Sequence, residues 1–203
     1  MEGRDELTAA LQLLGEVLEN SGQHFDLAII GGAALLLRGV ITRSTMDMDA
    51  VALVEGGSWR SSKPLPEALT AAVRDVAETL DLPREPRDEK DWLNGGPSIL
   101  LKTGLPPGFE KRATIQKFGG LTLRIAARID LIHLKLWSAT DSNRGSRRTV
   151  DIDDLLKLSP SKIELLRALS WCAKKDGRPD FAAVEAAPVI EQLGFTIEEL
   201  FDE

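Results

Sequence analysis

The spacing of apolar residues predicts that helices and short strands alternate in the first part of the chain. Leucines recur at helical spacing in residues 4–20, and residues 66–81 repeat this amphipathic pattern. Around them lie short apolar runs that are typical of strands: FDLAII, MDMDAVALV, SILL, ATIQKF and LTLRIA. We interpret GGSWRSSKPLP, which follows the second run, as a loop. These runs predict a small mixed sheet with helices packed on it.

From residue 127 onward the apolar pattern is helical throughout. The predicted helices are 127–139, 149–158, 160–174 and 181–193, followed by a short turn at 196–201. Ser159 is the expected cap of the helix that starts at Pro160, because proline is favoured in a first helical turn. We therefore predict an α+β fold with a sheet-containing core at 1–126 and a helical region at 127–203. The helical region could pack on the core as part of one continuous domain.

The amino-acid composition limits the kinds of molecule that this protein is expected to bind. The 203 residues are 43% hydrophobic, which is ordinary for a globular protein, and their net charge of −7 weighs against an extended nucleic-acid surface. The single cysteine, Cys172, excludes an internal disulfide and favours a reducing, cytoplasmic location. No apolar run approaches the length of a membrane span, so we expect no membrane partner.

Two aspartates in the run MDMDAVALV indicate a metal site. Side chains alternate along a strand, so Asp47 and Asp49 would share one face. Two carboxylates that close together repel one another unless a cation lies between them. Mg²⁺ (or Mn²⁺) suits such a pair, because magnesium is usually held by one or two carboxylates plus waters and substrate phosphates. The alternative is an edge strand whose aspartates simply face water.

A double glycine lies between the preceding strand and the helix that follows it. Gly31 and Gly32 would let the backbone approach a ligand closely, and the N–H groups of the next helix suit a phosphate. A tight strand–helix turn is the simpler alternative. Arg43 and Thr45 precede the aspartates and could contact phosphate, although Arg43 could also be a solvated loop charge. Together these residues describe a site for a nucleoside triphosphate.

A lysine and an aspartate further along the chain occupy unexpected helix faces. At 100° per residue, Lys135 falls within the apolar sector of its helix, whereas His133 falls on the polar side with Asp130. Asp151 groups with the leucines of the next helix. It could be a partner for Lys135, a third carboxylate of the site, or an acid that stabilises a helix N-terminus.

Two segments of the chain resemble a known superfamily. IIGGAALLLRG and TRSTMDMDAV resemble the signature of the DNA polymerase β-type nucleotidyltransferases, in which a glycine turn precedes a D-x-D pair. More narrowly, they are similar to the minimal nucleotidyltransferases of abortive-infection (AbiEii-like) toxin–antitoxin systems and their uncharacterised relatives. The later segments KLWSA, NRGSRR and DIDDL resemble the K-L-x-A, arginine-loop and D-x-x-D-L motifs of those proteins.

The resemblance implies a nucleotidyltransferase-type fold and the transfer of a nucleoside monophosphate from an NTP to an acceptor hydroxyl. It implies an enzyme that has an antitoxin partner if it is a toxin. The acceptor could be RNA, protein or a small molecule. The residues that it implicates are the catalytic Asp47, Asp49, Lys135 and Asp151, the nucleotide-binding Gly31, Gly32, Arg43 and Thr45, and Asp47 and Asp49 as metal ligands.

The sequence departs from the superfamily in its third carboxylate. Many members carry it on a central strand after the D-x-D pair, but SILL, ATIQKF and LTLRIA contain no Asp or Glu. The third carboxylate could be Asp151, could be Asp154, or could be absent. The alternative function is therefore a catalytically impaired nucleotidyltransferase fold that binds a nucleotide or a protein without turnover.

Overall fold

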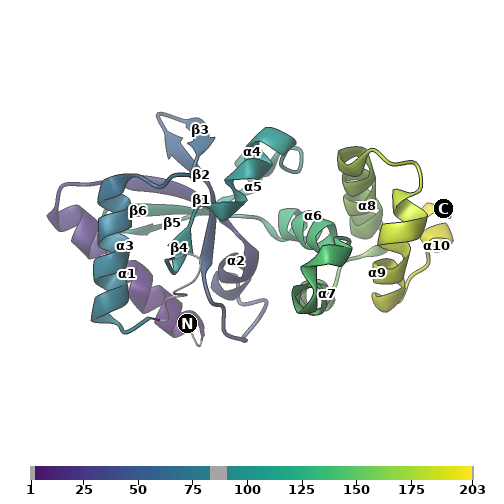
Figure 1. Cartoon of the computed structure of the whole chain (residues 1–203), viewed down its shortest axis with the longest axis horizontal. Coiled ribbons are helices and arrows are strands. Elements are labelled where there is room, and N and C mark those ends of the chain that lie inside the picture. Colours follow the sequence, from purple (N-terminus) through teal and green to yellow (C-terminus); the bar gives the residue numbers. More distant parts are fainter. Residues whose placement is uncertain (1–2, 83–90, 203) are drawn as a thin grey trace. The chain divides into compact units, whose positions relative to one another are not determined.

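The computed structural model describes residues 3–82 and 91–202 and divides the chain into two compact units. The N-terminal unit is Met1–Ala126 and the C-terminal unit is Ala127–Glu203. The fold is α+β: the N-terminal unit contains a mixed sheet with helices, and the C-terminal unit is helical (Figure 1). The predicted fold class is therefore confirmed.

The sheet of the N-terminal unit contains six strands among the described residues, in the order β3-β2-β1-β6-β5, with β4 pairing on β2. They are β1 (Phe25–Ile30), β2 (Met48–Glu55), β3 (Ser58–Ser61), β4 (Leu93–Asn94), β5 (Thr114–Phe118) and β6 (Leu121–Ile125). Strand β1 is central: Leu27 pairs with Leu53 of antiparallel β2 and with Leu123 of parallel β6. All of β1 from Leu27 onward is buried, as its continuous apolar run predicts.

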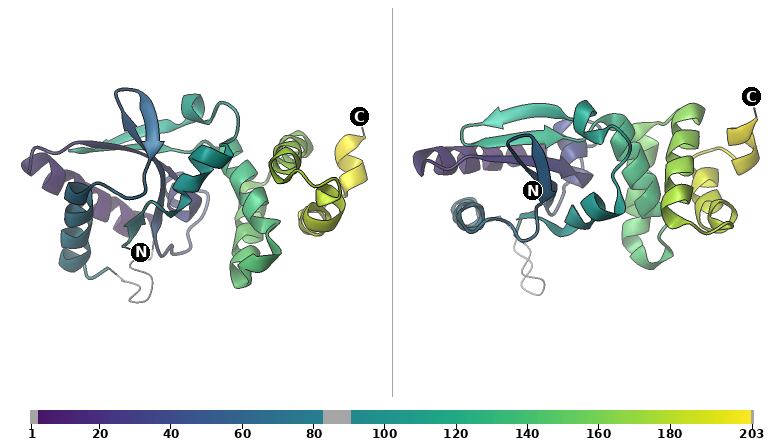
Figure 2. Two further views of the ribbon diagram at one scale, coloured as in Figure 1. Left: turned by 45° about the horizontal axis from the view of Figure 1, so that its top comes forward. Right: turned by 90° about the horizontal axis from the view of Figure 1, so that it is seen from above.

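Helices pack on this sheet through their apolar stripes. They are α1 (Arg4–Asn20), α2 (Gly31–Leu37), α3 (Glu67–Thr79), the 3₁₀ turn η1 (Gly96–Ser98), α4 (Ile99–Thr103) and α5 (Phe109–Arg112). Helix α1 contacts β5 and β6 and lies beside α3 (Figure 2). Its four regularly spaced leucines, Leu7, Leu11, Leu14 and Leu18, are fully buried, which confirms the stripe read from the sequence.

Two predictions for the N-terminal unit are wrong. The segment SILL is not a strand: it is the end of η1 and the start of α4, where Ile99 is 57% exposed and no alternating buried face exists. The segment GGSWRSSKPLP is not all loop, since Ser58–Ser61 forms β3 and pairs antiparallel with β2. Local composition does not reveal β3, because the strand exists through its hydrogen bonds to a neighbour rather than through an apolar pattern of its own.

The C-terminal unit is built around a central helix. Its elements are α6 (Arg128–Ala139), the 3₁₀ turn η2 (Ser142–Arg144), α7 (Ser146–Leu158), α8 (Lys162–Asp176), the π-helix η3 (Ala182–Ala186), α9 (Ala187–Gln192) and α10 (Ile197–Phe201). Helix α6 contacts both α7 and α8, so it is covered on more than one side. The predicted helix 181–193 contains a π turn in its first half, which the sequence pattern does not indicate.

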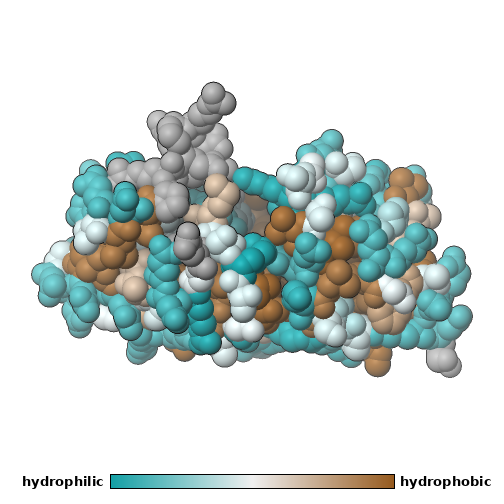
Figure 3. Space-filling model, turned by 90° about the horizontal axis from the view of Figure 1, so that it is seen from below, coloured by the Kyte–Doolittle hydropathy of each residue, from teal (hydrophilic) through white to brown (hydrophobic). Residues whose placement is uncertain are grey.

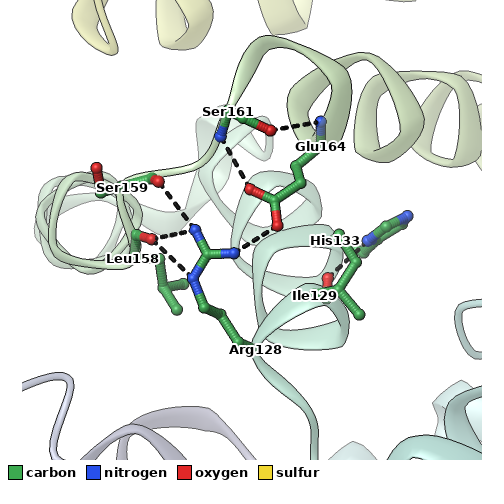
Figure 4. Close-up of polar contacts among 7 residues, drawn as sticks. All are labelled: Arg128, Ile129, His133, Leu158, Ser159, Ser161 and Glu164. Atoms are coloured by element: carbon green, nitrogen blue, oxygen red, sulfur yellow. Dashed lines mark hydrogen bonds and ion pairs between the residues drawn. The ribbon is translucent and has the colours of Figure 1, made fainter.

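This packing contradicts the prediction that α6 has a polar side facing water. His133 is 7% exposed and Asp130 is fully buried, although both were expected to face water. The Nδ1 atom of His133 lies 2.7 Å from the Ile129 carbonyl oxygen (Figure 4). The His133 ring also meets Trp171 of α8 edge-on. A helix enclosed by two neighbours has no solvent side, which a helical projection of α6 alone cannot show.

Arg128 joins the ends of three helices in the C-terminal unit (Figure 4). Its Nε and Nη2 atoms donate to the carbonyl oxygen of Leu158 at the end of α7, and Nη2 also donates to that of Ser159. Its Nη1 atom donates to Glu164 Oε1 at 2.5 Å. Glu164 forms a capping box with Ser161, so Ser161, not Ser159, caps α8. The predicted cap is corrected by two residues.

We expect Glu164 to make the stability of the chain depend on acid pH. Partial burial is the largest influence and raises the pKa of Glu164, but the hydrogen bonds from Arg128 and Ser161 and the Arg128 charge together hold it below its usual value of 4.5. Because the folded pKa is the lower one, ionised Glu164 stabilises the fold above pH 4.5, and this contribution is lost as the pH falls through the folded pKa.

The variant Glu164→Gln should therefore lower the free energy of unfolding at pH 7 by about 0.5–1 kcal/mol, the size of a partly exposed ion pair. The difference from wild type should shrink toward pH 3, as measured by urea unfolding at both pH values. The exposed Glu191 of α9 offers a matched control, since Glu191→Gln should show no such trend. An equal difference at pH 3 and pH 7 would contradict this role of Glu164.

The described surface combines polar residues with scattered apolar ones. Figure 3 shows apolar patches on one face that are interrupted by polar side chains. The large exposed apolar residues are Met46, Ile99, Ile115, Val150, Leu156, Ile163, Val184 and Phe201. Scattered exposure of this kind is usual in globular proteins. Among the helices of the described residues, none combines the length and the apolar character that crossing a membrane requires.

Candidate functional site

The two aspartates of the D-x-D pair lie at the start of β2, beside the end of β1. Asp49 pairs in register with Ile30 of β1, whereas Asp47 comes one residue before the strand begins. Both residues are half-buried. Strand β2 has neighbours on both sides, β1 and β3 (Figure 1), so the alternative of an edge strand is wrong. The aspartates therefore begin an interior strand.

The double glycine lies directly against these residues. Gly31 has a φ of +74°, and a Cβ atom there would lie 2.6 Å from Asp49 Oδ2. A Cβ atom on Gly32 would lie 2.8 Å from Thr45 Oγ1 and 3.9 Å from Arg43 Nη1. The structure thus brings together five residues that the sequence singled out, and the close approach requires a residue without a side chain. These contacts with Asp49 and Thr45, rather than the dipole of the seven-residue α2, are the observed role of the two glycines.

The segment before the aspartates is held by its own hydrogen bonds. Thr45 is 7% exposed and donates from Oγ1 to the carbonyl oxygen of Asp47 at 3.1 Å. Arg43 is exposed and donates from Nη1 to the carbonyl oxygen of Ser44. Thr45 therefore fixes the backbone on which Asp47 is carried. A contact of either residue with phosphate stays a prediction.

Asn94 belongs to this group, and sequence reasoning missed it. Its strand β4 pairs parallel with β2, so that Asn94 lies in register with Asp49. Its Nδ2 atom donates to Asp47 Oδ2 at 3.1 Å. A strand of two residues has no periodicity to detect, and the run LNGG after Trp92 looks like a turn. Only the pairing with β2 shows that Asn94 lies beside the aspartates.

Lys135 and Asp151 form a second group, inside the C-terminal unit. Lys135 Nζ lies 2.7 Å from Asp151 Oδ1 and 2.6 Å from Asp154 Oδ2, and Arg144 Nε lies 3.0 Å from Asp151 Oδ2. Lys135, Asp151 and Asp154 are 8%, 3% and 1% exposed. The expected partnership of Lys135 with Asp151 is therefore present, and Asp154 shares it. Two cations and two carboxylates balance each other in this buried cluster.

The two groups of predicted site residues lie in different units of the chain. Gly31, Gly32 and the aspartates are in the N-terminal unit, and Lys135 and Asp151 are in the C-terminal unit. The structure shows each group as a local arrangement. A catalytic role of Lys135 and Asp151 stays a prediction of the sequence resemblance.

The ligand set of the first group suits a metal that needs few protein ligands. Within residues 3–82 and 91–202, no group of three or more His, Cys, Asp and Glu side chains is placed to hold a metal ion. A closed zinc-type site is therefore not found there. Asp47 and Asp49, with Asn94 on one oxygen, offer the one or two carboxylates with which proteins usually hold Mg²⁺.

A match to a protein-family model points to the same class. Residues 5–62 match the model of a family described as a nucleotidyltransferase of unknown function, and this segment includes β1, both glycines and both aspartates. The predicted resemblance to the nucleotidyltransferases is thereby confirmed. The chain is also similar to the crystal structure of an antigenic nucleotidyltransferase-like protein from Paracoccidioides brasiliensis, at 20% identity and a TM-score of 0.46 over 90% of this chain and 93% of that one. No curated protein matches the chain.

Proposed function

We propose that this chain, whose residues 5–62 match a nucleotidyltransferase family of unknown function, transfers a nucleoside monophosphate from an NTP to an acceptor hydroxyl. The observation that supports this function is the close contact between Asp49 and Gly31. A Cβ atom on Gly31 would lie 2.6 Å from Asp49 Oδ2. A pair of carboxylates beside a glycine backbone, at the adjoining ends of two central strands, suits a metal-bound triphosphate.

Each residue of the group has a task in this proposal. Asp47 and Asp49 would hold the metal ion, and the missing side chains at Gly31 and Gly32 leave the space that the Asp49 and Thr45 side chains occupy. Thr45 keeps Asp47 in place through its hydrogen bond to the backbone. When bound, Mg²⁺ supplies positive charge that stabilises the triphosphate oxygens as pyrophosphate leaves. The acceptor hydroxyl attacks the α-phosphorus in line, and catalysis consists mainly of positioning and charge stabilisation.

The roles of Lys135 and Asp151 rest on the sequence resemblance. By that resemblance Lys135 holds the phosphates and Asp151 is the later carboxylate. Their described partners are one another, Asp154 for Lys135, and Arg144 for Asp151. A function as a toxin with an antitoxin partner, and the choice among RNA, protein and small-molecule acceptors, likewise rest on the resemblance. The cytoplasmic location rests on the single cysteine, Cys172.

One observation favours the alternative of a binding protein without turnover. The residue of β4 in register with Asp49 is the amide Asn94, so no third carboxylate lies at that position. The paired aspartates are equally compatible with binding a metal-bound nucleotide without transferring it. Transfer and binding must therefore be measured separately.

The test is a labelling experiment on the full chain. Each NTP, labelled at the α-phosphate, is incubated with the protein, Mg²⁺ or Mn²⁺, and either total RNA, a protein extract or a small-molecule fraction. Transfer predicts that the label enters one acceptor class, that γ-labelled NTP gives no labelled acceptor, and that EDTA stops the reaction. Binding of NTP in equilibrium dialysis without any transferred label would support the binding protein and contradict the enzyme.

A further inference from the structure

We propose that Asn94 is a positioning residue that holds one carboxylate oxygen of Asp47 and thereby presents the other to the metal ion. This inference rests on the proposed function, because it concerns the same metal site. Asn94 Nδ2 donates to Asp47 Oδ2 at 3.1 Å, and Asn94 Oδ1 accepts from the backbone N–H of Gly96 at 2.9 Å. Asn94 acts through Asp47 and does not itself bind substrate.

The orientation of the Asn94 amide is determined by its two partners. The backbone nitrogen of Gly96 can only donate, so it needs the amide oxygen. An ionised carboxylate can only accept, so Asp47 needs the amide nitrogen. Turning the amide around would leave both hydrogen bonds unmade. The side chain therefore has one favourable orientation, with its N–H groups toward Asp47.

The backbone around Asn94 is anchored on both sides of β4. Trp92 is 2% exposed and donates from Nε1 to the carbonyl oxygen of Val73, while its own carbonyl oxygen accepts from Met48 N. On the other side, a Cβ atom on Gly95 would lie 2.1 Å from the carbonyl oxygen of Ser62. Asn94 is thus carried on a segment packed closely against the sheet, which limits how far its amide can move.

The chemistry of the amide group explains why asparagine is suited to position 94, beside Asp47. A carboxylate at position 94 would add a third negative charge beside Asp47 and would offer no N–H group. An amide adds no charge, occupies Asp47 Oδ2 with a hydrogen bond and leaves Asp47 Oδ1 for a cation. Hydrogen bonds that orient a metal ligand typically change metal affinity by about 10–100-fold when they are removed. We expect a loss of that size at Asn94.

Two substitutions separate the positioning role from a structural one. Asn94→Ala removes both hydrogen bonds. Asn94→Ser keeps a hydroxyl that can accept from Gly96 N, as serine does in similar turns, but this side chain is too short to reach Asp47. Titrating the full-length protein with Mn²⁺ and measuring free Mn²⁺ by electron paramagnetic resonance gives the dissociation constant without any substrate. Both variants should raise that constant about 10–100-fold, while thermal unfolding of Asn94→Ser stays closer to wild type than that of Asn94→Ala.

A double-mutant cycle with Asp47→Ala identifies the partner. If Asn94 acts through Asp47, Asn94→Ala should change the Mn²⁺ dissociation constant less than about twofold once Asp47 is already gone, because the two effects share one interaction. Additive effects, or wild-type affinity in Asn94→Ser, would overturn the role of Asn94 alone. A wild-type protein that binds no Mn²⁺, or an Asp47→Ala variant that binds it unchanged, would overturn the metal site of the proposed function and the role of Asn94 with it.

Discussion

Replacing Asp49 with asparagine is expected to lower the rate of nucleotidyl transfer by about a thousandfold, because a metal ion supplies several kcal/mol of charge stabilisation and each 1.4 kcal/mol is a factor of ten. The amide keeps the shape of the side chain but loses the charge that attracts the cation. Since the substitution also removes one of two neighbouring like charges, the free energy of unfolding should stay within about 1 kcal/mol of wild type. Rates of label transfer and urea unfolding measure the two quantities.

A matched control lies on α3. Asp75 is an exposed aspartate of the same unit, and Asp75→Asn should leave transfer within about twofold of wild type, as is usual for surface substitutions away from a site. If Asp49→Asn retains wild-type transfer while the protein is active and folded, Asp49 is not a metal ligand of the reaction. If both variants lose activity equally, the loss reflects charge in general and not the site.

Replacing Lys135 with methionine is expected to lower the free energy of unfolding by about 3–5 kcal/mol, the cost of breaking a buried ion pair from one side. Asp151 would remain buried beside Arg144, and the buried Asp154 would lose the lysine that lies 2.6 Å from it. Denaturant unfolding measures the loss. Hydrogen exchange of peptides from α6 and α7 should locate it in the C-terminal unit, where the described contacts of this cluster lie.

Two further variants test this explanation. Lys135→Met combined with Asp154→Asn removes one cation and one anion and leaves Arg144 with Asp151, so it should be more stable than Lys135→Met alone. The exposed Lys157 of α7 is the control for the chemical change, since Lys157→Met should cost less than about 0.5 kcal/mol. A double variant no more stable than the single one would contradict charge imbalance as the cause.

The same variants separate stability from catalysis. If Lys135 holds phosphate, as the resemblance implies, the double variant should regain stability but not transfer activity. If Lys135 serves only the buried cluster, activity should return together with stability. Measuring both properties on one preparation therefore decides between the two roles of this lysine.

Features that depend on neighbouring residues in the chain could be predicted from the sequence. Spaced leucines predicted α1, and the apolar run FDLAII followed by two glycines predicted β1 and α2. The same local patterns identified Asp47 and Asp49 as candidate site residues and placed Lys135 in the apolar sector of its helix. These candidate residues could be found from the sequence because strand alternation and helical periodicity are properties of the local backbone.

Features that depend on distant partners could not be predicted in this way. Strand β3 and the two-residue β4 exist because β2 offers them hydrogen bonds, and SILL becomes helical where no neighbour buries an alternating face. His133 is buried because α7 and α8 cover α6 together. None of these conditions leaves a periodic signal in the segment itself.

By itself, the sequence determined which residue types this protein offers for a site: a glycine pair, two aspartates at alternating positions, and a lysine where an apolar residue belongs. Only the tertiary structure decided that Gly31 leaves room for Asp49, that Asn94 holds Asp47, and that Lys135 shares its charge with Asp151 and Asp154. The physical reason is that strand pairing and helix packing join residues far apart in the chain, and local periodicity carries no record of which distant residue becomes the partner.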